Sequence, residues 1–383
     1  MLKQSHYEEP TPPRNLRRER QLWYDGTSQM SSLGCDACPE RSICGSLRIK
    51  ARVFDCLAFC CGRAESCDNV CRNHPQYADR VREVGTFALE TVPQTPEILP
   101  PTLPTVIPML FHGSRRHLPL ATPAVALSLY SMFNRREGVP RFESREALCA
   151  AYGIATGSMI VLSGTDCDAP LERWWAIGET RRRIIIRALR HVGVALVTTP
   201  NYSLFTDVPR WSDLHSIKRI ALVHHEFMSE GLLAALHVNG RTETDFLRWS
   251  AYLVARPEVT HLAYEFTTGS RWAGRREQHA AWLCELVRAV KRPLHLCVRG
   301  GVEVLSELGR AFTGITVLET SAFIKTMMRQ RAFLNGNSHV DWSSAPTTAG
   351  APVDDLLIHN VSVMREWLRE VILPAPIMEP EGN

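Results

Sequence analysis

Short apolar runs recur through most of this chain, and each of them is followed by polar residues. Seven can be counted, at 105–111, 159–162, 194–199, 232–236, 261–264, 294–298 and 315–318. Segments with helical periodicity lie between them, for example at 179–191, 213–230 and 275–290. Short strands that alternate with helices are typical of βα units around a parallel sheet.

The number and regular spacing of these strands favour a closed (β/α)8-type barrel, with residues 85–92 as the eighth strand. A doubly wound open sheet is the alternative. No G-x-G-x-x-G follows a strand, and no G-x-x-x-x-G-K-[ST] occurs, so neither motif of nucleotide binding supports that alternative. We expect a flexible arm at 1–30, a Cys-rich module at 31–80, the barrel at 81–335 and a C-terminal extension at 336–383.

The Cys-rich module holds eight of the twelve cysteines. They are Cys35, Cys38, Cys44, Cys56, Cys60, Cys61, Cys67 and Cys71. Thiols at such short spacings favour a structural metal site, with zinc or an iron–sulfur cluster as candidates, and a disulfide knot is the alternative. The N-terminus is polar, and no apolar run approaches the roughly 20 residues needed to span a bilayer. We therefore expect a cytoplasmic protein with reduced thiols and no membrane contact.

Arginines cluster at four places in a chain whose formal charge is only +4. The clusters are Arg14, Arg17, Arg18 and Arg20; Arg115 and Arg116 with His117; Arg181, Arg182 and Arg183; and Arg271, Arg275 and Arg276. Such clusters suit phosphate contacts and raise the expectation of a nucleic-acid partner, with DNA favoured. Each could instead be a solvated helix or loop face.

In a barrel, the residues that follow the strands meet at one end, where active sites form. Here that end would collect Asp166, Asp168, Asn201, Tyr202, Asp207, His237, Asn239, Glu265, Arg299 and Glu319. Carboxylates dominate this set, which suits acid–base chemistry or stabilisation of an oxocarbenium-like transition state. A buried pairing of Glu265 and Glu319 with Arg299 is the structural alternative. Aromatic residues such as Trp174 and Trp175 could stack a base or could belong to the core.

The segment Thr199-Pro200-Asn201-Tyr202-Ser203-Leu204-Phe205-Thr206-Asp207-Val208-Pro209 resembles a signature of a little-characterised family of bacterial and phage proteins. In that family the loop reads approximately Ser-Pro-Asp-Phe-Ser-Leu-Tyr-x-Asp-Met-Pro. The similarity covers about 40 residues. The first Asp of the family is Asn201 here, so a nucleophile at that position would have to be replaced by another carboxylate, for which Asp207 is the candidate.

The Cys-rich head followed by a barrel also resembles bacterial anti-phage DNA glycosylases that remove glucosylated hydroxymethylcytosine. More distantly, it is similar to the metal-bearing transglycosylases that exchange guanine in tRNA and DNA. Both resemblances imply an N-glycosylase or a base-exchanging enzyme that flips its target nucleotide.

With this reaction, Asp207 or Asp166 would stabilise or capture the C1′ cation, while Asn201, His237 and Asn239 would read the base. Arg299 would hold a phosphate or a sugar hydroxyl, and no cofactor would be needed at the active site. Two other classes stay open: a metal-stabilised nucleic-acid-binding protein without catalysis, and an iron–sulfur redox enzyme.

Overall fold

The computed structural model describes residues 48–49, 52–53, 77–204, 210–267, 273–336, 339–348 and 350–372. Eight strands form one parallel sheet in the order β3-β12-β11-β10-β9-β8-β7-β4. Their bounds are β3 Val106–Pro108, β4 Ala124–Ser128, β7 Met159–Ser163, β8 Val194–Thr198, β9 Ala234–His237, β10 His261–Glu265, β11 His295–Arg299 and β12 Gly314–Glu319. The two end strands also meet, because Met109 and Ala126 form a parallel bridge. The predicted barrel is therefore confirmed as a nearly closed ring, and the open sheet is wrong.

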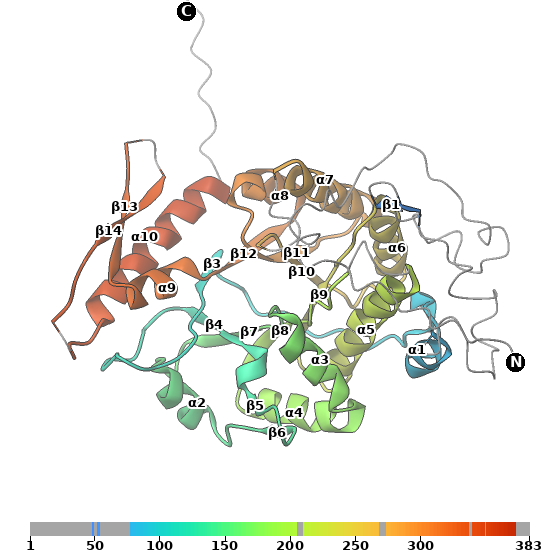
Figure 1. Ribbon diagram of the computed structural model, residues 1–383, viewed down its shortest axis with the longest axis horizontal. Coiled ribbons are helices and arrows are strands. Elements are labelled where there is room, and N and C mark those ends of the chain that lie inside the picture. The colour runs from blue at the N-terminus through green and yellow to red at the C-terminus, as the bar shows by residue number, and fades with distance from the viewer. Residues whose placement is uncertain are drawn as a thin grey trace, which may run out of the picture.

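Helices surround this ring (Figure 1). They are α2 Arg145–Tyr152, α3 Asp168–Ala176, α4 Glu179–His191, α5 Arg210–Ser229, α6 Glu243–Val254, α7 Ala273–Val290, α8 Leu305–Ala311 and α9 Ser321–Met327. Their apolar faces pack on the sheet: on α4, for example, Ile185 and Ile186 are fully buried. Helix α6 begins with a capping box, in which Thr242 and Asp245 satisfy each other's backbone N–H groups.

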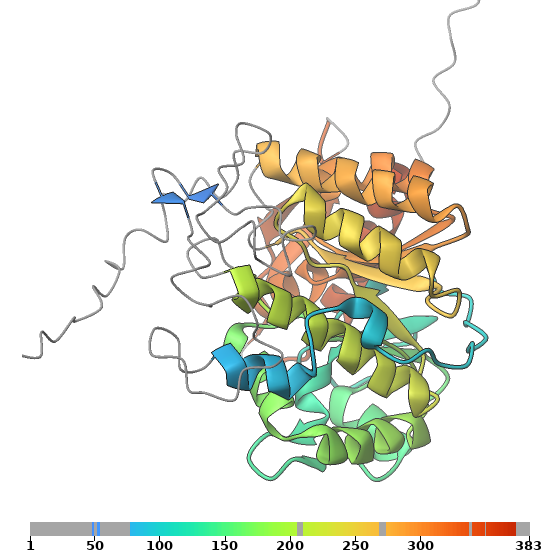
Figure 2. The ribbon, with the colours of Figure 1, turned by 90° about the vertical axis from the view of Figure 1, so that its right-hand side faces the viewer.

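The prediction that residues 85–92 form the eighth strand is wrong, because the eighth strand is β4. That segment holds a 3-10 turn, η4 Leu89–Thr91, and runs across the outer helices after α1 Tyr77–Val84 (Figure 2). Its backbone carbonyls accept hydrogen bonds from side chains instead of a neighbouring strand. Lys218 donates to the carbonyl of Ala88 at 2.5 Å, and Arg248 donates to the carbonyl of Phe87.

No helix lies between β3 and β4, and the last described helix, α10 Asp354–Ile372, covers this part of the ring. It packs against β3, α8 and α9 (Figure 1). The carboxylate of Asp354 fixes its start, because it accepts the backbone N–H groups of His117 and Leu118 at 2.9 and 3.2 Å.

Three two-stranded pairs and two further 3-10 turns complete the described structure. The pairs are β1 Arg48–Ile49 with β2 Arg52–Val53, β5 Phe133–Asn134 with β6 Val139–Pro140, and β13 Gln330–Leu334 with β14 Val340–Ser344. The turns are η5 Leu129–Ser131 and η6 Val302–Val304. The predicted boundary between barrel and extension, at 335, falls between β13 and β14. No helix in the described ranges is long and apolar enough to cross a bilayer.

Candidate functional site

The predicted site residues gather at the end of the barrel where the strands finish, which we call the mouth. Asp166 and Asp168 follow β7, and Asn201 and Tyr202 follow β8. His237 and Asn239 lie at the end of β9, and Glu265, Arg299 and Glu319 are the last residues of β10, β11 and β12. Asp207 and the eight predicted metal ligands lie outside the described residues.

Glu265 and Arg299 are register partners on adjacent strands, so they lie side by side on one face of the sheet. Tyr264 faces the opposite way, because its hydroxyl contacts His279 of α7. Glu265 is 5% exposed and accepts hydrogen bonds from the backbone N–H of Thr267, at 2.5 Å, and from its hydroxyl. The carboxylate therefore has a fixed orientation at the mouth.

Arg241 is a residue of this site that the sequence analysis missed. Burial lowers the pKa of Arg241, and nearby groups that favour the charged guanidinium oppose this lowering. These groups are Tyr264, Asp213, Asp245 and Glu265. Its Nε also donates to the carbonyl of Leu204 at 2.7 Å, so Arg241 connects the loop after β8 to the end of β10. Its position could have indicated its role, because Arg241 is a polar residue only two positions after Asn239, which was predicted to belong to the site.

The β7 side of the mouth carries two exposed carboxylates. Asp166 accepts the backbone N–H of Cys167 at 2.8 Å, and Asp168 accepts the hydroxyl of Ser203 at 2.5 Å. Tyr130, from η5, donates its hydroxyl to the carbonyl of Gly164 at 2.7 Å. Burial raises the pKa of Tyr130, and the charge of nearby Asp166 raises it further. Asp166 and Asp168 are both open to solvent.

Tyr202 is fully buried and offers no ring face to a substrate. The guanidinium of Arg219 lies 4.1 Å from its ring centre, and Trp175 meets it edge-on at 6.2 Å. Its hydroxyl has no hydrogen-bond partner among the described residues, and burial raises its pKa. The expected substrate contact is therefore replaced by packing between the loop after β8 and the helices.

His237 and Asn239 both contact residues that form the mouth. The His237 ring stacks on Tyr264 at 5.9 Å, and burial lowers the pKa of His237 to about 3, so the ring is neutral near pH 7. Asn239 donates its side-chain amide to the carbonyl of Tyr202 at 2.9 Å, and its own carbonyl accepts the Trp249 indole N–H at 2.8 Å. The amide thereby tethers the loop after β8. The carbonyl oxygen of the Asn201 side chain is buried without a partner in the described chain.

Glu319 caps the helix that follows it. Its carboxylate accepts the backbone N–H groups of Ser321 and Ala322, the latter at 3.0 Å. Burial raises the pKa of Glu319, and these hydrogen bonds oppose the rise. Its direct contacts are therefore those of a structural residue.

A pocket of about 260 Å³ opens beside Glu319 and Thr267. Its far wall comes from outside the barrel, where Trp342 of β14 and Trp367 of α10 are both partly buried. These two residues could not be predicted from the sequence, because neither lies near a barrel strand in the chain. Trp174 instead stacks on Phe227 in the core.

No group of three or more His, Cys, Asp and Glu side chains in the described ranges is arranged to hold a metal ion. Cys149, Cys284 and Cys297 are buried, as expected for core cysteines, whereas Cys167 is exposed beside Asp166.

No protein-family model matches this chain, and a search of the curated proteins gives no significant match either.

Proposed function

We propose that this chain hydrolyses an N-glycosidic bond of nucleic acid, with DNA the favoured substrate and a modified phage cytosine a candidate target. The observation that supports this proposal most directly is the in-register placement of Glu265 and Arg299 at the mouth, where Thr267 and Gly300 line a pocket flanked by tryptophans. A buried, oriented carboxylate is suited to stabilising the positive charge that develops at C1′ as the bond to the base breaks.

The neighbouring groups fit this role for Glu265. The positive charge of Arg241 favours its ionised form, and Thr267 holds its orientation. Arg299 is half-buried at the end of β11, and a guanidinium there is suited to a sugar hydroxyl or a phosphate oxygen. Asp166, which is exposed, remains the candidate for activating the attacking water.

The pocket beside Thr267 would hold the flipped base against Trp342 or Trp367. In this reaction the C1′–N bond breaks, water adds its oxygen to C1′, and the base leaves with a proton. The product is an abasic site. In the exchange version a second base takes the place of water.

Mass spectrometry of the supernatant tests the proposal. Purified protein is incubated with DNA carrying glucosylated hydroxymethylcytosine, with and without an isotopically labelled free base. We expect the modified base in the supernatant with the wild type and not with Glu265→Gln. Label entering the DNA would identify base exchange. Intact DNA with the wild type, where a control glycosylase works, would reject catalysis and leave a non-catalytic binding protein.

The metal module stays a prediction from the cysteine spacing. Elemental analysis of the full chain, purified without oxygen, would distinguish zinc from an iron–sulfur cluster, because only the cluster gives a brown protein that absorbs near 400 nm. This experiment also tests the iron–sulfur redox alternative.

A further inference from the structure

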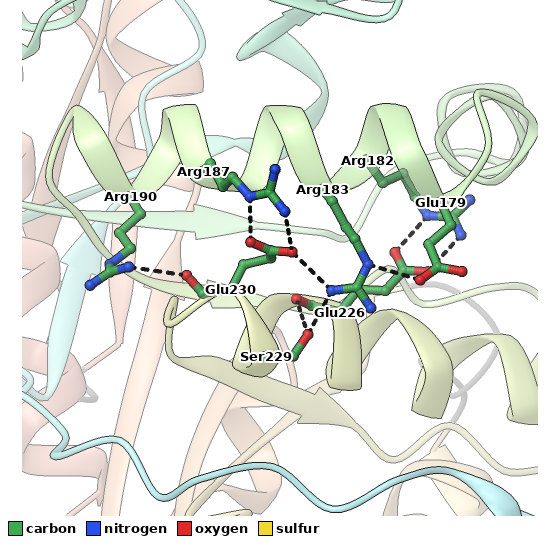
Figure 3. A network of polar contacts seen from close by, with 8 residues as sticks. All are labelled: Glu179, Arg182, Arg183, Arg187, Arg190, Glu226, Ser229 and Glu230. Carbon is green, nitrogen blue, oxygen red and sulfur yellow. Dashed lines mark hydrogen bonds and ion pairs between the residues drawn. The ribbon is translucent and has the colours of Figure 1, made fainter.

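The arginines of α4 do not form one basic surface, because most of them contact Glu226 of α5 or Glu230, which directly follows α5 (Figure 3). The Arg182 guanidinium donates to both oxygens of Glu226 at 2.6 and 2.7 Å. Arg183 and Arg187 reach the carboxylate of Glu230 at 2.9 and 2.6 Å. Their charges are neutralised within the fold, so the predicted phosphate contacts of Arg182 and Arg183 have no support here.

Arg181 belongs to a different surface, at the hairpin formed by β5 and β6. The tip of this hairpin carries Arg135 and Arg136, which are exposed. Arg173 of α3 donates to their two backbone carbonyls at 2.5 and 2.7 Å. The Arg181 side chain packs over the same tip, with its Cδ 3.2 Å from the position that a Cβ on Gly138 would occupy. We call these four residues the arginine corner.

The arginine corner carries a net positive charge. No carboxylate in the described part of the chain forms an ion pair with Arg135, Arg136 or Arg181. Glu137 adds one negative charge to the tip. Arg135, Arg136 and Arg181 are exposed, and guanidinium groups of this kind are suited to bidentate contacts with phosphate oxygens. Arg173 is half-buried and tethers the hairpin.

Two elements, η5 and α3, connect the arginine corner to the mouth. The hairpin follows β4 through η5, whose Tyr130 contacts the loop after β7. Arg173 lies five residues after Asp168, which begins α3 at the mouth. We propose that the arginine corner binds the phosphodiester backbone of the nucleic-acid strand whose base enters the mouth. This inference rests on the proposed function.

Salt-dependent DNA binding tests the inference. The variant Arg135→Gln/Arg136→Gln is compared with the wild type and with Arg187→Gln/Arg190→Gln, which removes the same charge from arginines that contact Glu230. The probe is a labelled duplex, and its dissociation constant is measured at several salt concentrations. We expect the corner variant to bind at least about tenfold more weakly. The slope of log K against log[salt] should fall by about 2, because each phosphate contact contributes about 0.9. The control variant should match the wild type.

Equal slopes for the corner variant and the control would overturn the inference, and so would a wild type that does not bind DNA. Vesicles containing anionic lipid provide a second arm. If the corner variant loses vesicle binding but keeps the wild-type DNA slope, the surface serves a membrane and the inference is wrong. DNA binding that depends on the corner, without any base release, would reject the proposed function and leave this inference standing. Base release by a corner variant that keeps the wild-type salt slope would support the proposed function and overturn this inference.

Discussion

Strands β10 and β11 begin with His261 and His295 and end with Glu265 and Arg299, and both pairs are in register. At the beginning, the two histidine rings stack at 4.9 Å, and His295 Nε2 lies 2.9 Å from the hydroxyl of Thr316. Burial lowers the pKa of both histidines to about 4, so they are neutral near pH 7. At the other end lie a carboxylate and a guanidinium beside a pocket.

The same two strands thus carry neutral, stacked rings at one end and charged groups near a pocket at the other. Neutral, stacked rings with hydrogen-bonded nitrogens stabilise a barrel end without attracting ligands. Charged groups beside a cavity attract ligands and contribute less to stability. This division agrees with the general behaviour of (β/α)8 barrels, in which the N-terminal face contributes stability and the C-terminal face carries function. It can be tested by changing each end separately.

The largest effect is expected for Glu265→Gln. Loss of the negative charge should lower the rate of base release by about a thousandfold, which corresponds to about 4 kcal/mol of transition-state stabilisation. The midpoint of thermal unfolding should fall only modestly, because glutamine retains an acceptor for Thr267 and because Asp213 and Asp245 still lie near Arg241. Single-turnover rates and calorimetry measure the two effects. A variant that unfolds at lower temperature but keeps its rate would assign Glu265 to structure.

The next largest effect is a pH dependence of stability, which His261 and His295 at the beginning of the two strands should cause. The unfolded histidines titrate near 6.5, and the folded His261 and His295 near 4, so the unfolded state binds more protons between these values. The contribution of these histidines to the free energy of unfolding should therefore be complete above about pH 6.5. It should fall towards pH 4, by up to about 3 kcal/mol per histidine.

Urea unfolding at pH 7 and pH 5 measures this loss. The variant His295→Gln should lose less stability between the two pH values than the wild type. An identical loss in both proteins would mean that His295 takes no part in it.

A smaller effect is expected for Thr316→Val. The Thr316 hydroxyl donates to the carbonyl of Pro104 and lies beside His295, both at 2.9 Å. Valine preserves the shape and removes both hydrogen bonds, which should cost about 1–2 kcal/mol of unfolding free energy. Chemical denaturation measures the cost. Base release should continue at the wild-type rate, and a strong loss of activity would show that the two ends are coupled.

The smallest effect is expected for Glu303→Gln, which serves as the matched control for Glu265→Gln. Glu303 follows β11 and pairs with Arg276 at 2.8 Å, but its side chain is 58% exposed. Removing an exposed ion pair should change the unfolding free energy by less than about 1 kcal/mol and leave base release unchanged. A rate as low as that of Glu265→Gln would indicate that the general negative potential of the mouth matters, and not one carboxylate.

The barrel could be predicted because seven strands carry a local signal, an apolar run that ends in polar residues. The strand β4 was missed because its apolar run continues into Leu129 and Tyr130 of η5, so no polar cluster marks its end. Residues 85–92 look like a strand in sequence. Their carbonyls are nevertheless taken by Lys218 and Arg248, which are more than 100 residues away in the chain.

The positions of the site residues could also be predicted, but not the environment of each side chain. Glu265 ends a strand and Tyr202 follows one, yet the first lies near a pocket and the second is covered by Arg219 of α5. Burial of a loop residue depends on which helix packs over it, and a single sequence does not record that contact. The pocket wall from Trp342 and Trp367 depends on the same kind of long-range packing.

The seam between β3 and β12 joins residues such as Val106 and Val317 that are far apart in the chain. During synthesis, β3 leaves the ribosome long before its neighbour, and α10 emerges later still. Nascent chains without these last elements therefore expose an unpaired edge strand and its apolar neighbours for many seconds. We expect a chaperone requirement during translation that ends once α10 has docked.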